Sequence, residues 1–125
     1  MFHTMIGLAA VSTALLGTAD PVPRPAPRAD LTLTYMADAG FAAAVKLTCY
    51  PTGGGHPKPA QACATLRRAG ADPAKLKPGD SMCVLLYQPV KAELKGVWQG
   101  RSVQWTQTYG NTCEMNRATG VLFDF

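Results

Sequence analysis

Four cysteines constrain the fold of this chain more than any other feature of its sequence. Cys49, Cys63, Cys83 and Cys113 lack the close paired spacing that a zinc site usually shows. An even number of widely spaced cysteines is typical of disulfides in an exported protein. Sequence alone allows three pairings, of which we favour the non-crossed one, Cys49 with Cys63 and Cys83 with Cys113. We therefore expect two bridges, no metal and no cofactor.

The first 30 residues resemble segments that precede a folded domain. Residues 5–17 form an apolar run followed by small residues, which predicts a signal peptide over residues 1–19. The run is shorter than the about 20 apolar residues that span a bilayer, so we expect no membrane contact after processing. Closely spaced prolines in residues 20–30 favour an extended N-terminal arm. The folded domain is predicted over residues 31–125 of a secreted, extracellular protein.

Alternating apolar and polar residues predict antiparallel strands. Such alternation occurs in residues 31–35 and 41–49, with turn residues at 38–40 between them. It recurs in residues 90–94 and 103–109, where Gly96 and the pair 99–100 are expected to form bends or turns. The C-terminal residues 121–125 could add a last strand.

One helix and one shorter helical turn are predicted between these hairpins. Residues 59–69 have Pro59 near the first turn and Gly70 just past the end, as helices often do. A short turn is expected to begin at Asp72 and Pro73, because Asp can cap and Pro is tolerated at the first helical position. Clustered hairpins with a helix between them favour an α+β fold over a doubly wound parallel sheet.

The charge pattern and the histidines argue against two function classes. The formal net charge is +4, but lysines and arginines are scattered along the chain, so we expect no nucleic-acid binding. Beyond the predicted signal peptide, His56 is the only histidine, and it lies in a Gly/Pro-rich stretch without a recognisable nucleophile motif. We interpret His56 as a solvated turn residue and expect no catalysis by this chain.

Residues 82–87, Met-Cys-Val-Leu-Leu-Tyr, are the most apolar run of the predicted domain. For an apolar run taken alone, a buried strand is the simpler interpretation. The alternative is an exposed segment that enters a protease cleft as substrate does, with Leu85 in the primary pocket and the attacked bond before Leu86. A bridge at Cys83 would then fix the upstream side, and Pro89 would stiffen the downstream side. A preformed segment loses little conformational entropy on docking.

Six segments and all four cysteines carry a resemblance to a known family. The segments are residues 49–57, 66–73, 82–90, 96–100, 111–116 and 123–125. Their residues and their order are similar to those of the Streptomyces subtilisin inhibitor family, over residues 31 to 125.

The resemblance implies an α+β two-layer sandwich, in which a five-stranded antiparallel sheet has two helices packed on one face. It implies the bridges Cys49–Cys63 and Cys83–Cys113, and a homodimer formed through the sheet. It also implies that the chain is a secreted inhibitor of serine endopeptidases and not an enzyme. Its partners would be extracellular subtilisin-like proteases, and chymotrypsin-like enzymes also accept large apolar side chains such as Leu85.

The same resemblance places the reactive bond between Leu85 and Leu86. Asn111 matches a family position from which an amide could hydrogen-bond and support the loop together with Pro89; a plain surface Asn is the alternative. The protease-contacting residues would be Met82, Cys83, Val84, Tyr87 and Gln88.

Two residues of this loop depart from the family pattern. Val84 stands where the family often has Pro or Thr, and Gln88 where it often has Asp; Gly110 adds a flexible residue beside Asn111. These departures leave an alternative open, a secreted binding or structural protein that keeps the fold without inhibitory activity.

Overall fold

The computed structural model describes Gly17 and residues 26–125. The predicted signal peptide, apart from Gly17, and residues 20–25 of the predicted arm lie outside the described residues. The last residues assigned to the arm belong to the domain, because the first strand begins at Ala29.

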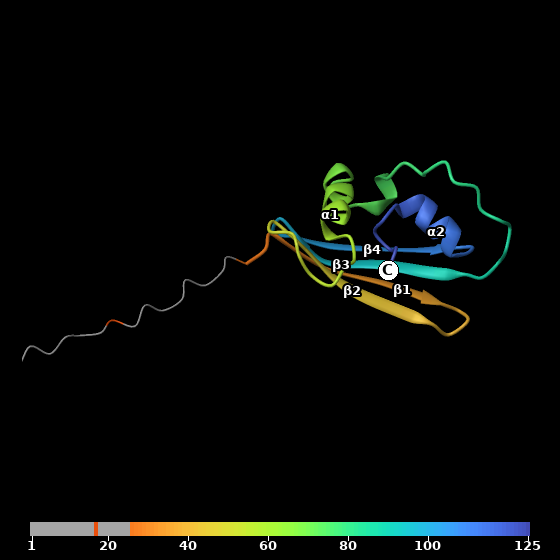
Figure 1. The fold of residues 1–125 in the computed structure, drawn as a ribbon, viewed down its shortest axis with the longest axis horizontal. Helices are drawn as coiled ribbons and strands as arrows, with labels where there is room; N and C mark the ends of the chain where they lie inside the picture. Colours follow the sequence, from red (N-terminus) through yellow and green to blue (C-terminus); the bar gives the residue numbers. More distant parts are fainter. Residues whose placement is uncertain (1–16, 18–25) are drawn as a thin grey trace, which may run out of the picture.

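In the described part of the chain, four strands form one antiparallel sheet (Figure 1). The sheet order is β2-β1-β3-β4, so each predicted hairpin forms and β1 pairs with β3 at the centre. Both hairpins follow from the alternation of apolar and polar residues seen in the sequence. The strands are β1 Ala29–Ala37, β2 Ala42–Cys49, β3 Val90–Trp98 and β4 Arg101–Tyr109.

The expected fifth strand at residues 121–125 is wrong. This segment is a turn followed by a tail in which the neighbours Leu122 and Phe123 are both buried, whereas a strand would turn successive side chains to opposite faces. Its carbonyls are satisfied by side chains instead of a strand ladder. Tyr35 donates its hydroxyl to the Phe125 carbonyl over 2.7 Å.

The expected bend at Gly96 is also wrong. The expected turn at residues 99–100 is confirmed. Gly96 lies inside β3 at φ 147°, opposite Leu31 of β1. A Cβ atom at this position would lie 2.2 Å from the carbonyl oxygen of Asp30. The glycine is therefore needed for close approach of the two central strands.

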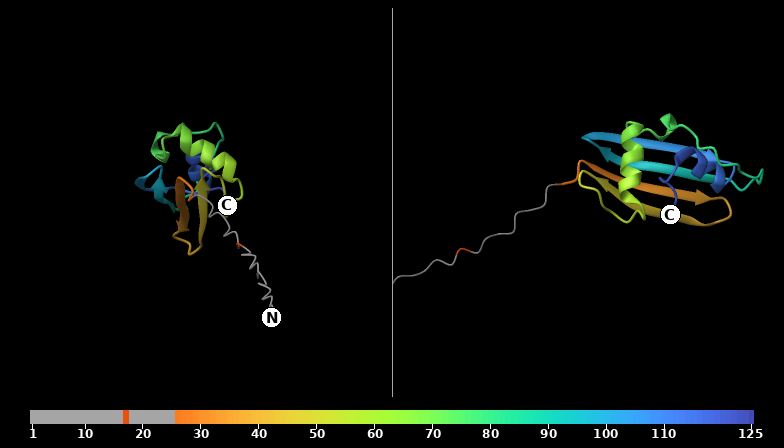
Figure 2. Two further views of the ribbon diagram at one scale, coloured as in Figure 1. Left: turned by 90° about the vertical axis from the view of Figure 1, so that its left-hand side faces the viewer. Right: turned by 45° about the horizontal axis from the view of Figure 1, so that its top comes forward.

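Two helices cover one face of the sheet and leave the other face open (Figure 2). The first, α1 Pro59–Arg68, confirms the prediction to within one residue, and the predicted short turn is the 3₁₀ helix Pro73–Lys75, capped by Asp72. The second helix, α2 Thr112–Thr119, was not located by the strand and helix patterns. The expected two-layer α+β arrangement is confirmed, with four strands. Its largest fully buried side chains are Leu31, Leu33, Leu47, Leu66, Val90, Leu94, Met115, Leu122 and Phe123.

Both favoured disulfides are present. Cys49–Cys63 joins the end of β2 to α1, with a Cα–Cα distance of 5.8 Å. Cys83–Cys113 joins the long segment before β3 to α2, with a Cα–Cα distance of 5.7 Å. A two-layer domain of about 100 residues has a limited core, so each bridge adds a significant share of its stability.

His56 is buried, which corrects the interpretation of a solvated turn residue. Its Nδ1 accepts a hydrogen bond from the Lys58 N–H over 2.9 Å, so its Nε2 carries the proton. This Nε2 lies 3.1 Å from the Val121 carbonyl and 3.0 Å from the Leu122 carbonyl. His56 thus holds the C-terminal tail against the sheet, and both ring nitrogens are engaged.

Candidate functional site

The segment between the 3₁₀ helix and β3 forms an exposed arch at one end of the molecule (Figure 1). Residues 81–89 have no regular secondary structure. Leu85 is fully exposed, and Met82 is 95% exposed. The interpretation of this run as a buried strand is therefore wrong. We call residues 82–88 the apolar loop.

The exposure of large apolar side chains in this loop is unusual for this fold, which buries most of its other leucines. Val84 and Tyr87 are also strongly exposed, and Leu86 is about half exposed at 53%. Contiguous exposed apolar side chains of this kind mark a surface that another molecule covers.

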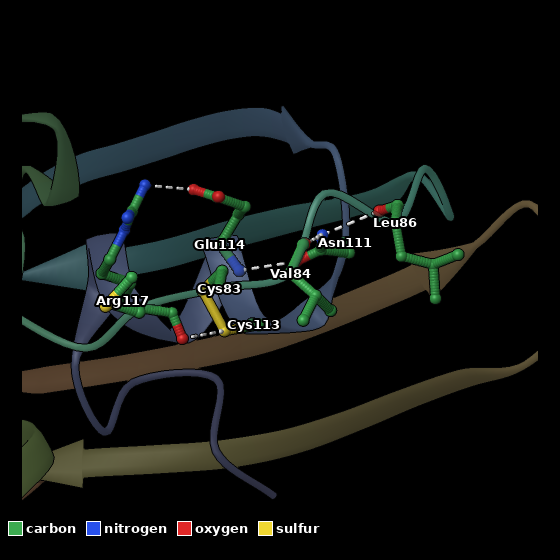
Figure 3. A network of polar contacts seen from close by, with 8 residues as sticks. Cys83, Val84, Leu86, Asn111, Cys113, Glu114 and Arg117 are labelled. Atoms are coloured by element: carbon green, nitrogen blue, oxygen red, sulfur yellow. Dashed lines mark hydrogen bonds and ion pairs between the residues drawn. A yellow bond between two sulfur atoms is a disulfide. The ribbon is translucent and has the colours of Figure 1, made fainter.

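The upstream side of the apolar loop is fixed by a covalent bond. Cys83 is bridged to Cys113, which lies in the first turn of α2 (Figure 3). The α2 helix also carries an ion pair between Glu114 in its first turn and Arg117 in its last turn. Glu114 is also an acidic residue in the first turn, where it interacts favourably with the helix dipole.

Asn111 connects the same helix to both sides of Leu85. Its Nδ2 donates to the Leu86 carbonyl over 2.8 Å and to the Val84 carbonyl over 3.3 Å (Figure 3). Its Oδ1 accepts from the Glu114 N–H over 2.8 Å and so caps α2. All the polar atoms of this amide are engaged, and Asn111 is only 8% exposed. The plain surface Asn is therefore ruled out.

Main-chain hydrogen bonds fix the downstream side. Gln88 donates its N–H to the Gly110 carbonyl over 2.8 Å. The Pro89 carbonyl accepts from the Asp38 N–H over 3.2 Å, which links the loop to the β1–β2 turn. Within the loop, the Leu86 N–H donates to the Val84 carbonyl over 2.9 Å, so Leu85 sits at the tip of a tight turn.

The loop stands over an open hollow of about 420 Å³ and not over packed core. Leu86, Tyr109, Gly110 and Glu114 are among the residues that line it. Burial raises the pKa of the Tyr109 phenol above its ordinary value of 10.0. The loop thus depends on a few specific bonds for its shape.

This arrangement exposes a stretch of fixed main chain at the surface. The described residues contain no group of three His, Cys, Asp or Glu side chains that could hold a metal. They also contain no helix that is long and apolar enough to cross a membrane. A disulfide-linked domain that holds an exposed apolar segment in place by a bridge and by hydrogen bonds has a surface suited to binding a partner.

Comparison with known proteins identifies the family. The family model described as subtilisin inhibitor-like matches residues 27–111, and the chain belongs to this family. Subtilisin inhibitor-like protein 1 of Streptomyces cacaoi is 43% identical over 93 residues, which cover 71% of this chain and 84% of the relative. A subtilase-type protease inhibitor of Streptomyces fradiae is 43% identical over 101 residues, covering 76% of this chain and 71% of the relative.

A solved structure agrees with this assignment. Streptomyces caespitosus sermetstatin, in complex with Bacillus licheniformis subtilisin, superposes with a TM-score of 0.66 at 28% identity. The match covers 77% of this chain and 97% of sermetstatin. The predicted resemblance is confirmed, and these relatives are named as a subtilisin inhibitor-like protein and a subtilase-type protease inhibitor.

Sequence reasoning missed part of the support beneath the loop. It did not anticipate that Asn111 begins a helix, that Gly110 accepts from Gln88, or that Asp38 contacts Pro89. A signal for the first was present, since Asn111 followed three residues later by Glu114 matches the start of a capped helix. The two backbone contacts depend on tertiary structure and have no local signature.

Proposed function

We propose that this protein is a secreted inhibitor of subtilisin-like serine endopeptidases that offers the Leu85–Leu86 bond to the enzyme. One observation carries the proposal: Leu85 is fully exposed while the carbonyls on both sides of it, those of Val84 and Leu86, are held by Asn111. A side chain projects into solvent from a main chain that is fixed. The exposed side chain gives a protease a group to bind, and the fixed main chain opposes release of the products after cleavage.

The first step of the proposed interaction is substrate-like. The side chain of Leu85 fills the primary pocket, and the serine hydroxyl attacks the Leu85 carbonyl carbon. Breaking the Leu85–Leu86 bond yields an ester between Leu85 and the serine, and a new amine at Leu86 that takes a proton from the catalytic histidine. Further hydrolysis requires this amine to leave so that water can enter.

The geometry opposes departure of that amine. The Leu86 carbonyl is bound by Asn111, and two residues further on the Gln88 N–H is bound by Gly110. The acyl side is held by the Cys83 bridge and by the Val84 carbonyl, which Asn111 also binds. Because the amine stays close to the ester, its attack back on the acyl carbon has a high effective concentration and re-forms the peptide bond.

The departures at Val84 and Gln88 leave this support in place. Val84 contributes a carbonyl to Asn111, and any residue at this position supplies one. Gln88 contributes its backbone N–H to Gly110, which likewise does not depend on the side chain. These contacts favour an inhibitor over a binding protein that has lost inhibition.

Leu85 sets the preference among proteases in this proposal. A large apolar side chain suits the pockets of subtilisin-like and chymotrypsin-like enzymes and leaves the Asp in a trypsin pocket unpaired. A Streptomyces longisporus relative that is 46% identical over 94 residues, covering 74% of this chain and 65% of the relative, is named trypsin inhibitor STI2. Relatives of this chain thus include a protein named for a different target protease.

We also propose that two copies pair through the open face of the sheet. That face carries the exposed apolar side chains Met36 and Val97 together with threonines of β1 and β4. Both helices lie on the other face, so pairing leaves the loop free at the end of the molecule (Figure 2). Light scattering behind gel filtration distinguishes a dimer of the mature chain from a monomer.

The experiment that tests inhibition is a titration. A fixed amount of subtilisin is mixed with increasing amounts of the mature protein, and residual hydrolysis of a small substrate is measured. Activity should fall linearly to zero near one chain per enzyme. Full activity at equimolar mixing would favour the alternative, a binding protein without inhibitory function.

A further inference from the structure

The β1–β2 turn lies at the same end of the molecule as the apolar loop (Figures 1 and 2). It is a tight and well-bonded turn: the Ala37 N–H donates to the Phe41 carbonyl over 2.8 Å, and the Gly40 N–H to the Ala37 carbonyl over 2.9 Å. The Asp38 N–H then donates to Pro89, at the downstream end of the loop. The turn and the loop are therefore held in a fixed relation.

A second hollow separates this turn from the loop. Its volume is about 370 Å³, and its walls include Ala39 and Phe41 from the turn, Tyr87 from the apolar loop and Pro89 just after it. Tyr87 also lines the hollow beneath Leu86. The second hollow is thus bordered by Tyr87 and Gln88, two residues that the proposed function assigns to the protease contact.

Phe41 gives this hollow an apolar wall that is only partly covered. Its side chain is 51% exposed. Its ring packs edge-on against Tyr35, with 6.2 Å between ring centroids, and Tyr35 is anchored through its hydroxyl to the C-terminal carbonyl of Phe125. A half-exposed aromatic ring on a rigid support binds an apolar partner with little loss of conformational entropy.

The size of the interface requires contacts beyond the loop. A stable protein–protein interface uses about 20 to 30 residues on each side, and the seven residues 82–88 fall well short of that. An extended chain advances about 3.3 Å per residue, so the segment from Leu86 to Pro89 reaches roughly 10 Å past the bond. At that point the next exposed element is the β1–β2 turn.

We propose that residues 38–41 form a second contact region for the protease, on the leaving-group side of the cleft. The occupant of the hollow is an apolar side chain from the rim of the enzyme, packed between Phe41 and Tyr87. This inference rests on the proposed function. If residues 38–41 contact the enzyme, the β1–β2 turn helps to decide which protease is inhibited among those whose primary pockets accept Leu85.

Two substitutions test this region. Phe41→Ala removes the apolar wall, and loss of a partly buried ring should raise the inhibition constant for subtilisin about tenfold. Ala39→Asp places a charge at the rim of the hollow, on an exposed turn residue whose side chain supports no core packing. It should weaken binding by a similar factor while the melting temperature stays unchanged.

The matched control is Ala74→Asp, the same substitution at an exposed position in the 3₁₀ helix. It should leave the inhibition constant at the wild-type value. If Phe41→Ala does not fold, Ala39→Asp decides the question alone. Amide hydrogen exchange of residues 38–41 should also slow in the complex.

The outcomes distinguish a failure of the second contact region from a failure of the proposed inhibitory function. If wild-type protein does not inhibit, the proposed function fails. If wild-type protein and Ala39→Asp inhibit equally, and residues 38–41 exchange at the same rate free and bound, the loop is the contact and the β1–β2 turn is not. A loss of inhibition in Ala39→Asp that Ala74→Asp does not share supports the second contact region.

Discussion

The side-chain amide of Asn111 donates to the carbonyl of Leu86 over 2.8 Å, while its oxygen caps the helix that carries Cys113. Asn111 therefore connects the exposed loop to α2, because its Nδ2 binds the loop and its Oδ1 caps the helix. If this tie prevents digestion, removing it should change the kinetics of cleavage more than the strength of the first encounter.

Asn111→Asp separates the two roles of this residue. Aspartate keeps the oxygen that accepts from the Glu114 N–H, so α2 stays capped, but it has no N–H to offer Val84 or Leu86. The new carboxylate oxygen faces the carbonyl oxygens of Val84 and Leu86 in a largely buried site, so we expect a melting temperature below wild type and a loop that subtilisin cuts and releases over time. Residual protease activity followed for hours after mixing measures this recovery.

Asn111→Ala is the companion variant, because it removes the cap as well and should lower the free energy of unfolding by about 1 kcal/mol in addition. Stable inhibition by Asn111→Asp over the same period, equal to wild type, would show that the amide does not retain the leaving group.

Leu85→Lys should redirect the inhibitor. A lysine at this position meets the carboxylate in a trypsin-like pocket and loses apolar contact in a subtilisin-like one. We expect inhibition of trypsin to appear and inhibition of subtilisin to weaken by at least tenfold, measured as inhibition constants for both enzymes. Leu86→Lys, one residue further on, serves as the position control. Unchanged selectivity in Leu85→Lys would place the primary contact elsewhere.

The two disulfides should differ in what they control. Replacing Cys83 and Cys113 by serine, or Cys49 and Cys63, should cost about 3 to 4 kcal/mol of stability in either case by the chain-entropy account. Only the first pair fixes the apolar loop. At a temperature where both variants are folded, the Cys83/Cys113 variant should be digested by subtilisin at the loop, and the Cys49/Cys63 variant should still inhibit. Equal digestion of both would contradict the local role of the Cys83 bridge.

Gly96→Ala tests the packing of the central strands. The added Cβ would lie 2.2 Å from the Asp30 carbonyl oxygen at a φ that L residues rarely adopt, so we expect a loss of at least about 2 kcal/mol. Gly55→Ala is the control, since a Cβ there meets nothing within 4 Å. Denaturant unfolding of both variants measures the difference. A Gly96→Ala protein as stable as the control would mean that the strands can separate without cost.

Much of this fold could be predicted because the information is local. Alternation in residues 31–35 and 90–94 defines two central strands, and Pro59 and Gly70 delimit α1. The pairing of the four cysteines did not follow from local pattern, since the sequence allows three pairings; the non-crossed pairing was favoured, and the resemblance to a family implied it. The exposure of Leu85 could not be read from its apolar neighbours, because an apolar run is equally typical of a buried strand, and the resemblance to a family supplied that part.

The errors share a physical cause. Residues 121–125 alternate only weakly, and they become a tail because His56 and Tyr35, both far away in the sequence, bind their carbonyls. His56 is buried by that same tail. Gly96 was interpreted as a bend because glycine is common in turns, whereas its role depends on the approach of Asp30 from another strand. Contacts between residues far apart in the sequence cannot be predicted from the local sequence pattern.

The most direct test of the account is to map the bond that a protease attacks. Mature protein is incubated with a small amount of subtilisin, and the products are identified by mass spectrometry as residual activity is recorded. We predict one cut, between Leu85 and Leu86, that stops at a constant ratio of cut to intact chain while both forms still inhibit. A first cut at any other bond, or continued digestion with no loss of protease activity, would contradict the account.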